Sequence, residues 1–216
     1  MRLVGMRTVS GIGVVERDEE ETFLSEVVPV HGAPLVLVAR GNGPRTPDEM
    51  LVLASGSGQV TARIPLDGPH GDLALFPYDY GPADDRPVTA VADVLVARTR
   101  LWSISADHLT AFALDGEGIR WTWRSKGTVV GVFRHDTDVV AVSKYVAPDD
   151  AGSGPDGTVH VHLLEGSTGA VRAVRRLRGY QAGMRGRYHL DREGHLFHTS
   201  HEGHHLWSPV QMFRLW

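Results

Sequence analysis

The chain has 216 residues, with 22 Lys and Arg against 26 Asp and Glu, and no cysteine. Without thiols there are no disulfides, thiolate metal sites or cysteine nucleophiles, which fits a reducing compartment. The net charge of −4 argues against a nucleic-acid partner.

The N-terminal segment and the length of the apolar runs bear on location. Residues 1–10 lack the apolar core of about 7–15 residues that a secretory signal needs. No apolar run approaches the ~20 residues of a membrane-spanning helix. We therefore expect a cytoplasmic protein with no membrane partner.

Short apolar stretches rich in β-branched residues recur along the chain, bounded by Gly, Pro and Asp. None shows the 3.6-residue spacing of an amphipathic helix. Each has the length and composition of a strand. The clearest are 33–39, 49–54, 90–97, 127–133 and 138–143. The pattern predicts an all-β protein with one domain over 1–216, as a propeller, sandwich or barrel.

A repeated phrase of polar turn, strand, glycine turn and strand favours the propeller. Its turns fall near residues 56, 107, 157 and 194. That spacing is roughly 40–50 residues, the period of one four-stranded blade. We predict a small or partial β-propeller of about four to five blades, with a β-sandwich or barrel as the alternative.

Two of these phrases carry a recognisable motif. The first runs from Ala113-Leu-Asp to Trp121, and the second from Leu164 to Gly169. They resemble the quinoprotein-type (PQQ-like) propeller repeat, Ala-Leu-Asp-Ala-x-Thr-Gly-x-x-x-Trp. The first lacks the threonine, and the second has Ala173 in place of the tryptophan. We expect the acidic residue and threonine to bind turn amides, the glycine to take a positive φ and the tryptophan to pack between blades.

The resemblance does not imply that this chain binds a quinone cofactor. The quinone-dependent enzymes of that group are longer, usually exported and often use a vicinal cysteine pair, which this chain lacks. No organic cofactor is therefore expected. Pairing of 211–216 with 8–15 would close the ring within one chain. An open ring would leave sheet edges for a homo-oligomer.

Histidines supply the candidate metal ligands. His160 and His162 lie two apart on a predicted strand, so both side chains point the same way. His201 and His204 would face each other across a turn at 202–203. Glu165 or a histidine of the next blade is a candidate third ligand, because a catalytic zinc needs three. The alternative is a polar strand face and an exposed hairpin without metal.

A run of arginines flanked by tyrosines is a candidate anion site. The run contains Arg175, Arg176, Arg178, Arg185 and Arg187. The whole chain holds 20 Arg against two Lys, a bias typical of a GC-rich genome. That bias weakens the functional interpretation of the cluster.

No catalytic signature is present. The sequence contains neither a Gly-x-Ser-x-Gly nucleophile elbow nor a phosphate-binding loop. Our first hypothesis is a non-enzymatic propeller scaffold that binds a protein partner or a small ligand. The alternative is a hydrolase or lyase that holds a divalent metal with His160, His162 and a C-terminal histidine.

Overall fold

The structure is a computed structural model of the whole chain. Every regular element in its described part is a β-strand, and no helix there is long and apolar enough to cross a membrane. The described residues are 5–9, 12–16, 21–30, 33–39, 47–53, 60–65, 72–73, 88–100, 107–145, 158–177, 186–200 and 210–216.

The strands form four antiparallel sheets in chain order. The first sheet contains β1 (Gly5–Val9), β2 (Ile12–Glu16), β3 (Glu21–Val30), β4 (Ala33–Ala39), β5 (Pro47–Leu53) and β6 (Val60–Pro65). The second contains β7 (Asp72–Leu73), β8 (Val88–Val91), β9 (Val94–Arg100), β10 (His108–Ala113) and β11 (Ile119–Arg124). The third contains β12 (Thr128–His135), β13 (Asp138–Tyr145), β14 (Thr158–Glu165) and β15 (Val171–Leu177). The fourth contains β16 (Gly186–Leu190), β17 (His195–Ser200) and β18 (Val210–Arg214).

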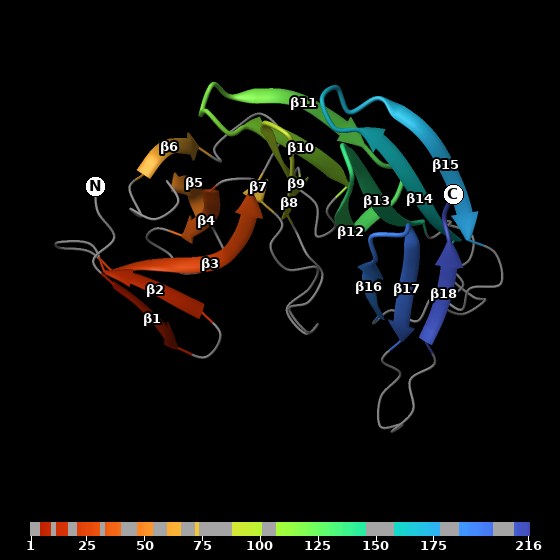
Figure 1. Cartoon of the computed structure of the whole chain (residues 1–216), viewed down its shortest axis with the longest axis horizontal. Coiled ribbons are helices and arrows are strands. Elements are labelled where there is room, and N and C mark those ends of the chain that lie inside the picture. The colour runs from red at the N-terminus through yellow and green to blue at the C-terminus, as the bar shows by residue number, and fades with distance from the viewer. Residues whose placement is uncertain are drawn as a thin grey trace.

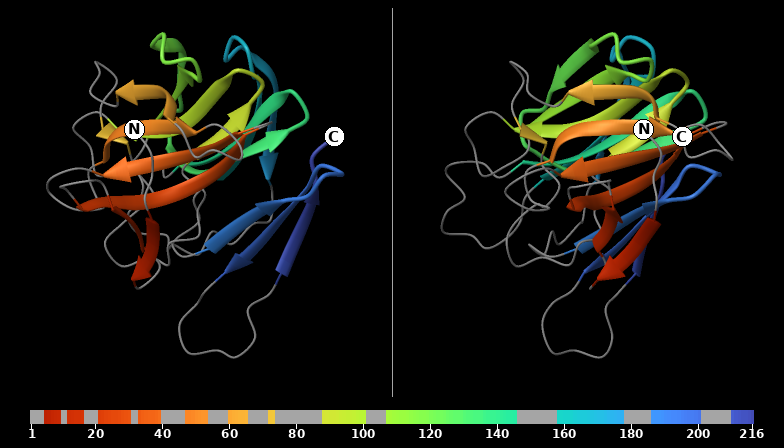
Figure 2. Two further views of the ribbon diagram at one scale, coloured as in Figure 1. Left: turned by 60° about the vertical axis from the view of Figure 1, so that its left-hand side comes forward. Right: turned by 90° about the vertical axis from the view of Figure 1, so that its left-hand side faces the viewer.

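The four sheets follow one another along an arc, as blades do in a propeller (Figure 1). One strand of each sheet meets its counterpart in the next: β3 contacts β8, β8 contacts β12, and β12 contacts β16. Figure 2 shows the fourth sheet beside the third from two further directions. The all-β propeller prediction is confirmed, and the sandwich and barrel alternatives are not needed.

Apolar layers between neighbouring sheets hold the arc together. Alternation along β14 sends Leu164 toward the second sheet, where it joins Val96 and Leu109, and Val161 toward the fourth, where it joins Leu196. All of these side chains are fully buried. The third sheet therefore has an apolar contact on each of its two faces.

Trp121 on β11 makes the contact that the repeat motif implies. Its indole Nε1 donates a hydrogen bond of 2.8 Å to the Gly166 carbonyl, in the turn between β14 and β15 of the next sheet. Gly169 in the same turn has φ 71°, and Trp121 lies against it. Thr168 Oγ1 accepts the Ala170 N–H at 3.2 Å and donates to Glu165 at 2.6 Å. These contacts confirm the expected roles of the threonine, the glycine and the tryptophan. In the first motif the acidic residue also acts as expected, because Asp115 accepts the Glu117 N–H at 2.9 Å.

The two ends of the arc pair within their own sheets. β1 pairs with β2, and β18 pairs with β17. They lie at opposite ends of the arc in Figure 1. The expected pairing of 8–15 with 211–216 is not present among the described strands. A single domain over 1–216 and a closed ring stay predictions.

Candidate functional site

His160 and His162 lie on one face of β14, as the sequence predicts. Their ring centroids are 6.1 Å apart, with the rings edge to face. The face they share points toward the second sheet, where the Trp123 ring lies 4.8 Å from that of His162. Because β14 is the third strand of its sheet, counted from β12, the pair lies away from the inner strands that line the arc.

The surroundings of the pair keep both imidazoles neutral near pH 7. Burial, followed by the charge of His160, lowers the pKa of His162 to about 4. Burial, followed by Arg176 and Lys126, lowers the pKa of His160. His162 Nε2 lies 3.3 Å from Ser143 Oγ, and its buried Nδ1 has no partner among the described residues. A ring nitrogen without a partner destabilises the fold by about 1–3 kcal/mol.

Neutral imidazoles suit a metal, but a third ligand is lacking in the described part of the chain. The one group of three potential ligands found there does not include His160 or His162. Glu165 instead receives hydrogen bonds from Thr168 at 2.6 Å and from Arg172 at 2.6 Å. His201 and His204 lie outside the described residues. A divalent metal at any of these histidines stays a prediction.

The predicted arginine cluster is divided by the strand it lies on. Arg175 and Arg176 are neighbours on β15, so their side chains leave opposite faces. Arg175 donates to the Arg214 carbonyl of the fourth sheet, while Arg176 pairs in register with His160. Arg178 and Arg185 lie outside the described residues, and Arg187 lies on β16. Anion binding by the whole run stays a prediction, and Arg176 is the member that joins the histidine pair.

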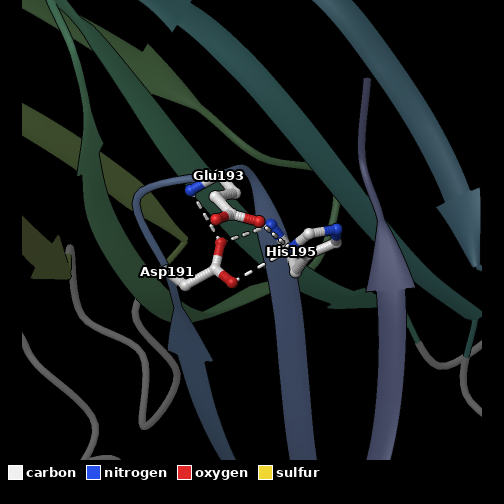
Figure 3. Close-up of side chains that lie close together, drawn as sticks. All are labelled: Asp191, Glu193 and His195. Atoms are coloured by element: carbon white, nitrogen blue, oxygen red, sulfur yellow. Dashed lines mark hydrogen bonds and ion pairs between the residues drawn. The ribbon is translucent and has the colours of Figure 1, made fainter.

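Asp191, Glu193 and His195 form a second cluster, in the turn between β16 and β17 (Figure 3). Each offers one ligand atom, and these atoms lie within 4.8 Å of one another. Asp191 Oδ1 accepts the N–H groups of Glu193 at 2.9 Å and His195 at 2.8 Å, and Oδ2 lies 3.0 Å from His195 Nδ1. The carboxylate therefore closes the turn, as an Asp at the start of a turn commonly does by accepting backbone N–H groups further along.

Burial raises the pKa of Asp191, but hydrogen bonds from the backbone and side chain of His195 outweigh it and hold that pKa below its usual value. The sequence did not predict this cluster, because its three side chains come together only through the turn between β16 and β17. Its geometry is explained by the turn alone.

The fourth sheet has one covered face and one open face. Leu196 and Phe213 pair in register and pack against the third sheet. Their neighbours Phe197 and Met212 also pair, and alternation places them on the other side. There Val210 is 62% and Met212 61% exposed. We call Phe197, Val210 and Met212 the open face.

His162 and His198 both have a pKa lowered to about 4, so we expect the stability of the fold to fall at acid pH. Burial, followed by Lys144, lowers the pKa of His198 to about 4. In the unfolded chain the same group titrates near 6.5, so the unfolded state binds the proton first. The stabilisation is complete above about pH 6.5 and is lost as the pH falls toward 4.

Replacing His198 with Asn is therefore expected to reduce the drop in unfolding free energy between pH 7 and pH 5, measured by urea denaturation. The difference between the two pH values separates titration from the packing that the substitution also removes. An unchanged difference would mean that His198 does not titrate on unfolding. His162 should contribute a second part of the same slope.

Comparisons with known proteins identify the fold. No family model matches the chain, and no curated protein matches it. The structure of BamB from Moraxella catarrhalis is similar, with 11% identity, a TM-score of 0.51 and coverage of 99% of this chain. The fold is that of a β-propeller. This chain spans 62% of the length of that BamB chain.

Two more distant structures were also found. KlHsv2 with loop 6CD replaced by a Gly-Ser linker is 7% identical with a TM-score of 0.46, over 98% of this chain and 70% of that one. The Myceliophteria thermophila Cps50 (Swd1) β-propeller domain is 10% identical with a TM-score of 0.30, over 97% and 92%. The fold assignment rests on the BamB structure, and at 11% identity that similarity describes the fold and no activity.

Proposed function

We propose that this chain is a non-enzymatic propeller scaffold that binds a protein partner through the open face of the fourth sheet. The observation that carries the proposal is the exposure of Val210 and Met212, at 62% and 61%, on a sheet whose other face is buried. Fully burying a side chain of either kind stabilises a complex by about 1.5–3 kcal/mol.

The chemistry around the open face indicates what the partner presents. Arg214 and His189 are exposed, and alternation places both on the same side as Met212. Apolar centres with a polar rim are typical of protein interfaces. Asp191 and Glu193 lie beside His195, which pairs with Arg214, so the rim carries both signs of charge. The partner we expect offers an apolar surface with a polar edge.

The enzymatic alternative has less support. A hydrolase or lyase would need a third ligand at His160 and His162, and the described residues offer none. The neighbouring cations Arg176 and Lys126 also disfavour a bound metal ion.

The cytoplasmic location remains part of the proposal. We also infer that the blades belong to the quinoprotein-type repeat, supported by the contact between Trp121 and Gly166.

A crosslinking experiment tests the proposed interface. A photoreactive amino acid in place of Met212 should capture the partner in cells, while the same amino acid in place of Val171 should not. Val171 is a matched control, because it is an apolar residue 47% exposed on β15 of the third sheet. The captured protein is then purified and its affinity for the intact chain is measured.

With the purified partner, Met212→Asp is expected to weaken binding at least about tenfold, since it places a charge in the buried centre of the interface. Val171→Asp should leave the affinity within about twofold. If both variants bind alike, or if crosslinks form only through position 171, the open face is not the interface. Turnover of a small molecule by the purified chain alone would contradict the non-enzymatic assignment.

A further inference from the structure

The first and fourth sheets lie at the two ends of the arc, and each meets one neighbouring sheet among the described strands (Figure 1). In the fourth sheet the other side is the open face, where Val210 is 62% and Met212 61% exposed. These side chains are apolar, so water contact with them is unfavourable. The question is what surface covers them.

The first sheet also has one side that meets its neighbour and one that does not. Val52 is 7% exposed and pairs in register with Ala62 on β6. The Cβ of Ala62 lies 3.9 Å from the position of a Cβ added to Gly116, in the turn between β10 and β11 of the second sheet. Alternation along β6 places Thr61 on the opposite side, where it is exposed. We call the side of the first sheet that carries Thr61 the outward face.

The composition of the first sheet is that of a blade covered on both sides. β4 is apolar at all seven positions, from Ala33 to Ala39. A strand with one side in water alternates apolar and polar residues, whereas a strand buried on both sides is a continuous apolar run. Within the described part of the chain the second sheet covers one side, so this composition predicts a further neighbour for the other.

The contacts inside the chain show what kind of surface covers such a face. The third sheet has a layer of apolar side chains on each side, shared with the second sheet on one side and with the fourth on the other. Phe197 and Met212 continue the same alternation to the far side of the fourth sheet. The open face is thus built as the next layer of this series, and another blade-like sheet is the surface that matches it.

We propose that the partner of the open face is the outward face of the first sheet in a second copy of this chain. The inference rests on the proposed function, because it names the partner of that same face. The outward face combines an apolar strand, β4, with a polar outer strand, β6, on which Thr61 and Arg63 are exposed. It therefore has the apolar surface and polar edge expected of the partner.

The contact joins two unlike surfaces, so it is head-to-tail and each copy uses both ends of its arc. Head-to-tail contacts give a closed ring when successive copies turn back on themselves, and an open filament when they do not. Because the four sheets already curve along an arc, we expect the copies to close a ring (Figure 1).

Sedimentation velocity of the intact chain over a series of concentrations tests the association. The chain is expected to associate, and Met212→Asp should weaken the association at least about tenfold, because it buries a charge at the contact. Val171→Asp is the matched control and should leave it within about twofold, since Val171 lies on the third sheet. A chain that is monomeric at every concentration would overturn the proposal.

A mixing experiment tests the head-to-tail arrangement. Thr61→Arg should also weaken the association, whereas Thr122→Arg, at an exposed position of the second sheet, should not. A mixture of the Met212→Asp and Thr61→Arg chains should recover pairs, because the unaltered open face of one meets the unaltered outward face of the other. Recovery also shows that both variants are folded. A mixture that associates no better than either variant alone, or a Thr61→Arg chain that associates normally, would overturn the arrangement.

Crosslinking identifies the two surfaces directly. With a photoreactive amino acid at position 212 and a mixture of isotopically labelled and unlabelled chains, the joined peptides should come from two different chains. The second peptide should lie within residues 21–65, which contain β3 to β6. Crosslinks that form only within one chain would contradict the proposal.

The same crosslink in cells separates this inference from the proposed function. Capture of a different protein by a chain that stays monomeric would overturn the second copy as partner and leave the open face as the interface. A monomeric chain that captures nothing at position 212 would overturn both.

Discussion

Replacing Trp121 with alanine is expected to lower the free energy of unfolding by about 3–5 kcal/mol, the range for loss of a buried aromatic side chain. Trp121 is 7% exposed and belongs to the apolar layer between the second and third sheets. The substitution removes that packing and leaves the Gly166 carbonyl without its indole donor. Urea denaturation followed by far-UV circular dichroism measures the change without relying on tryptophan fluorescence.

A phenylalanine at the same position separates the two contributions. Trp121→Phe keeps most of the ring but not the N–H, so it should lower the unfolding free energy by about 1–3 kcal/mol. Trp123→Ala is the matched control, because Trp123 lies two residues away on β11 and is only partly buried. If Trp123→Ala lowers the unfolding free energy as much as Trp121→Ala does, the contact with the Gly166 turn adds no stability of its own.

Gly169→Ala is expected to lower the unfolding free energy by more than Gly118→Ala. Both glycines have a positive φ, 71° and 102°, so each substitution adds about 1–2 kcal/mol of backbone strain. A Cβ on Gly169 would lie 2.6 Å from the Trp121 ring, whereas a Cβ on Gly118 would meet nothing within 4 Å. Overpacking should add about 1–3 kcal/mol at position 169 alone.

The same denaturation measurement checks this difference, and a double mutant checks its cause. In a Trp121→Ala background the ring is gone, so Gly169→Ala should then resemble Gly118→Ala. The coupling between the two sites would be visible as non-additive losses. Additive losses would place the strain at Gly169 in the turn itself rather than against the indole.

The spacing of turns predicted the fold because blade repeats are a local pattern with a fixed period. Local reasoning also placed Trp121 between blades, and strand alternation put His160 and His162 on one face, as the structure confirms. Alternation also separates Arg175 from Arg176. That separation was readable from the sequence, since both lie on one strand.

The partners of these residues were not predictable in the same way. The contact of His162 with Trp123 joins residues 39 positions apart, and it depends on how two sheets pack. Bulges in the ladders between β10 and β11 and between β14 and β15 shift the register by one residue, which no turn signal in the sequence marks. The open face depends on the order of the sheets, so a strand pattern alone did not reveal Val210 and Met212.

The contacts between neighbouring sheets differ along the chain, and Ala173 marks the difference. Where the repeat would supply a second tryptophan, this residue is exposed and small. The joint between the second and third sheets has an indole hydrogen-bonded across it, whereas the next joint has apolar packing that includes Phe133 and Tyr188, together with the contact of Arg175 with Arg214. Cooperative unfolding units follow such differences in local stability. We therefore expect the fourth sheet to separate from the third at lower free energy than global unfolding, and amide hydrogen exchange on β17 should be faster than on β13.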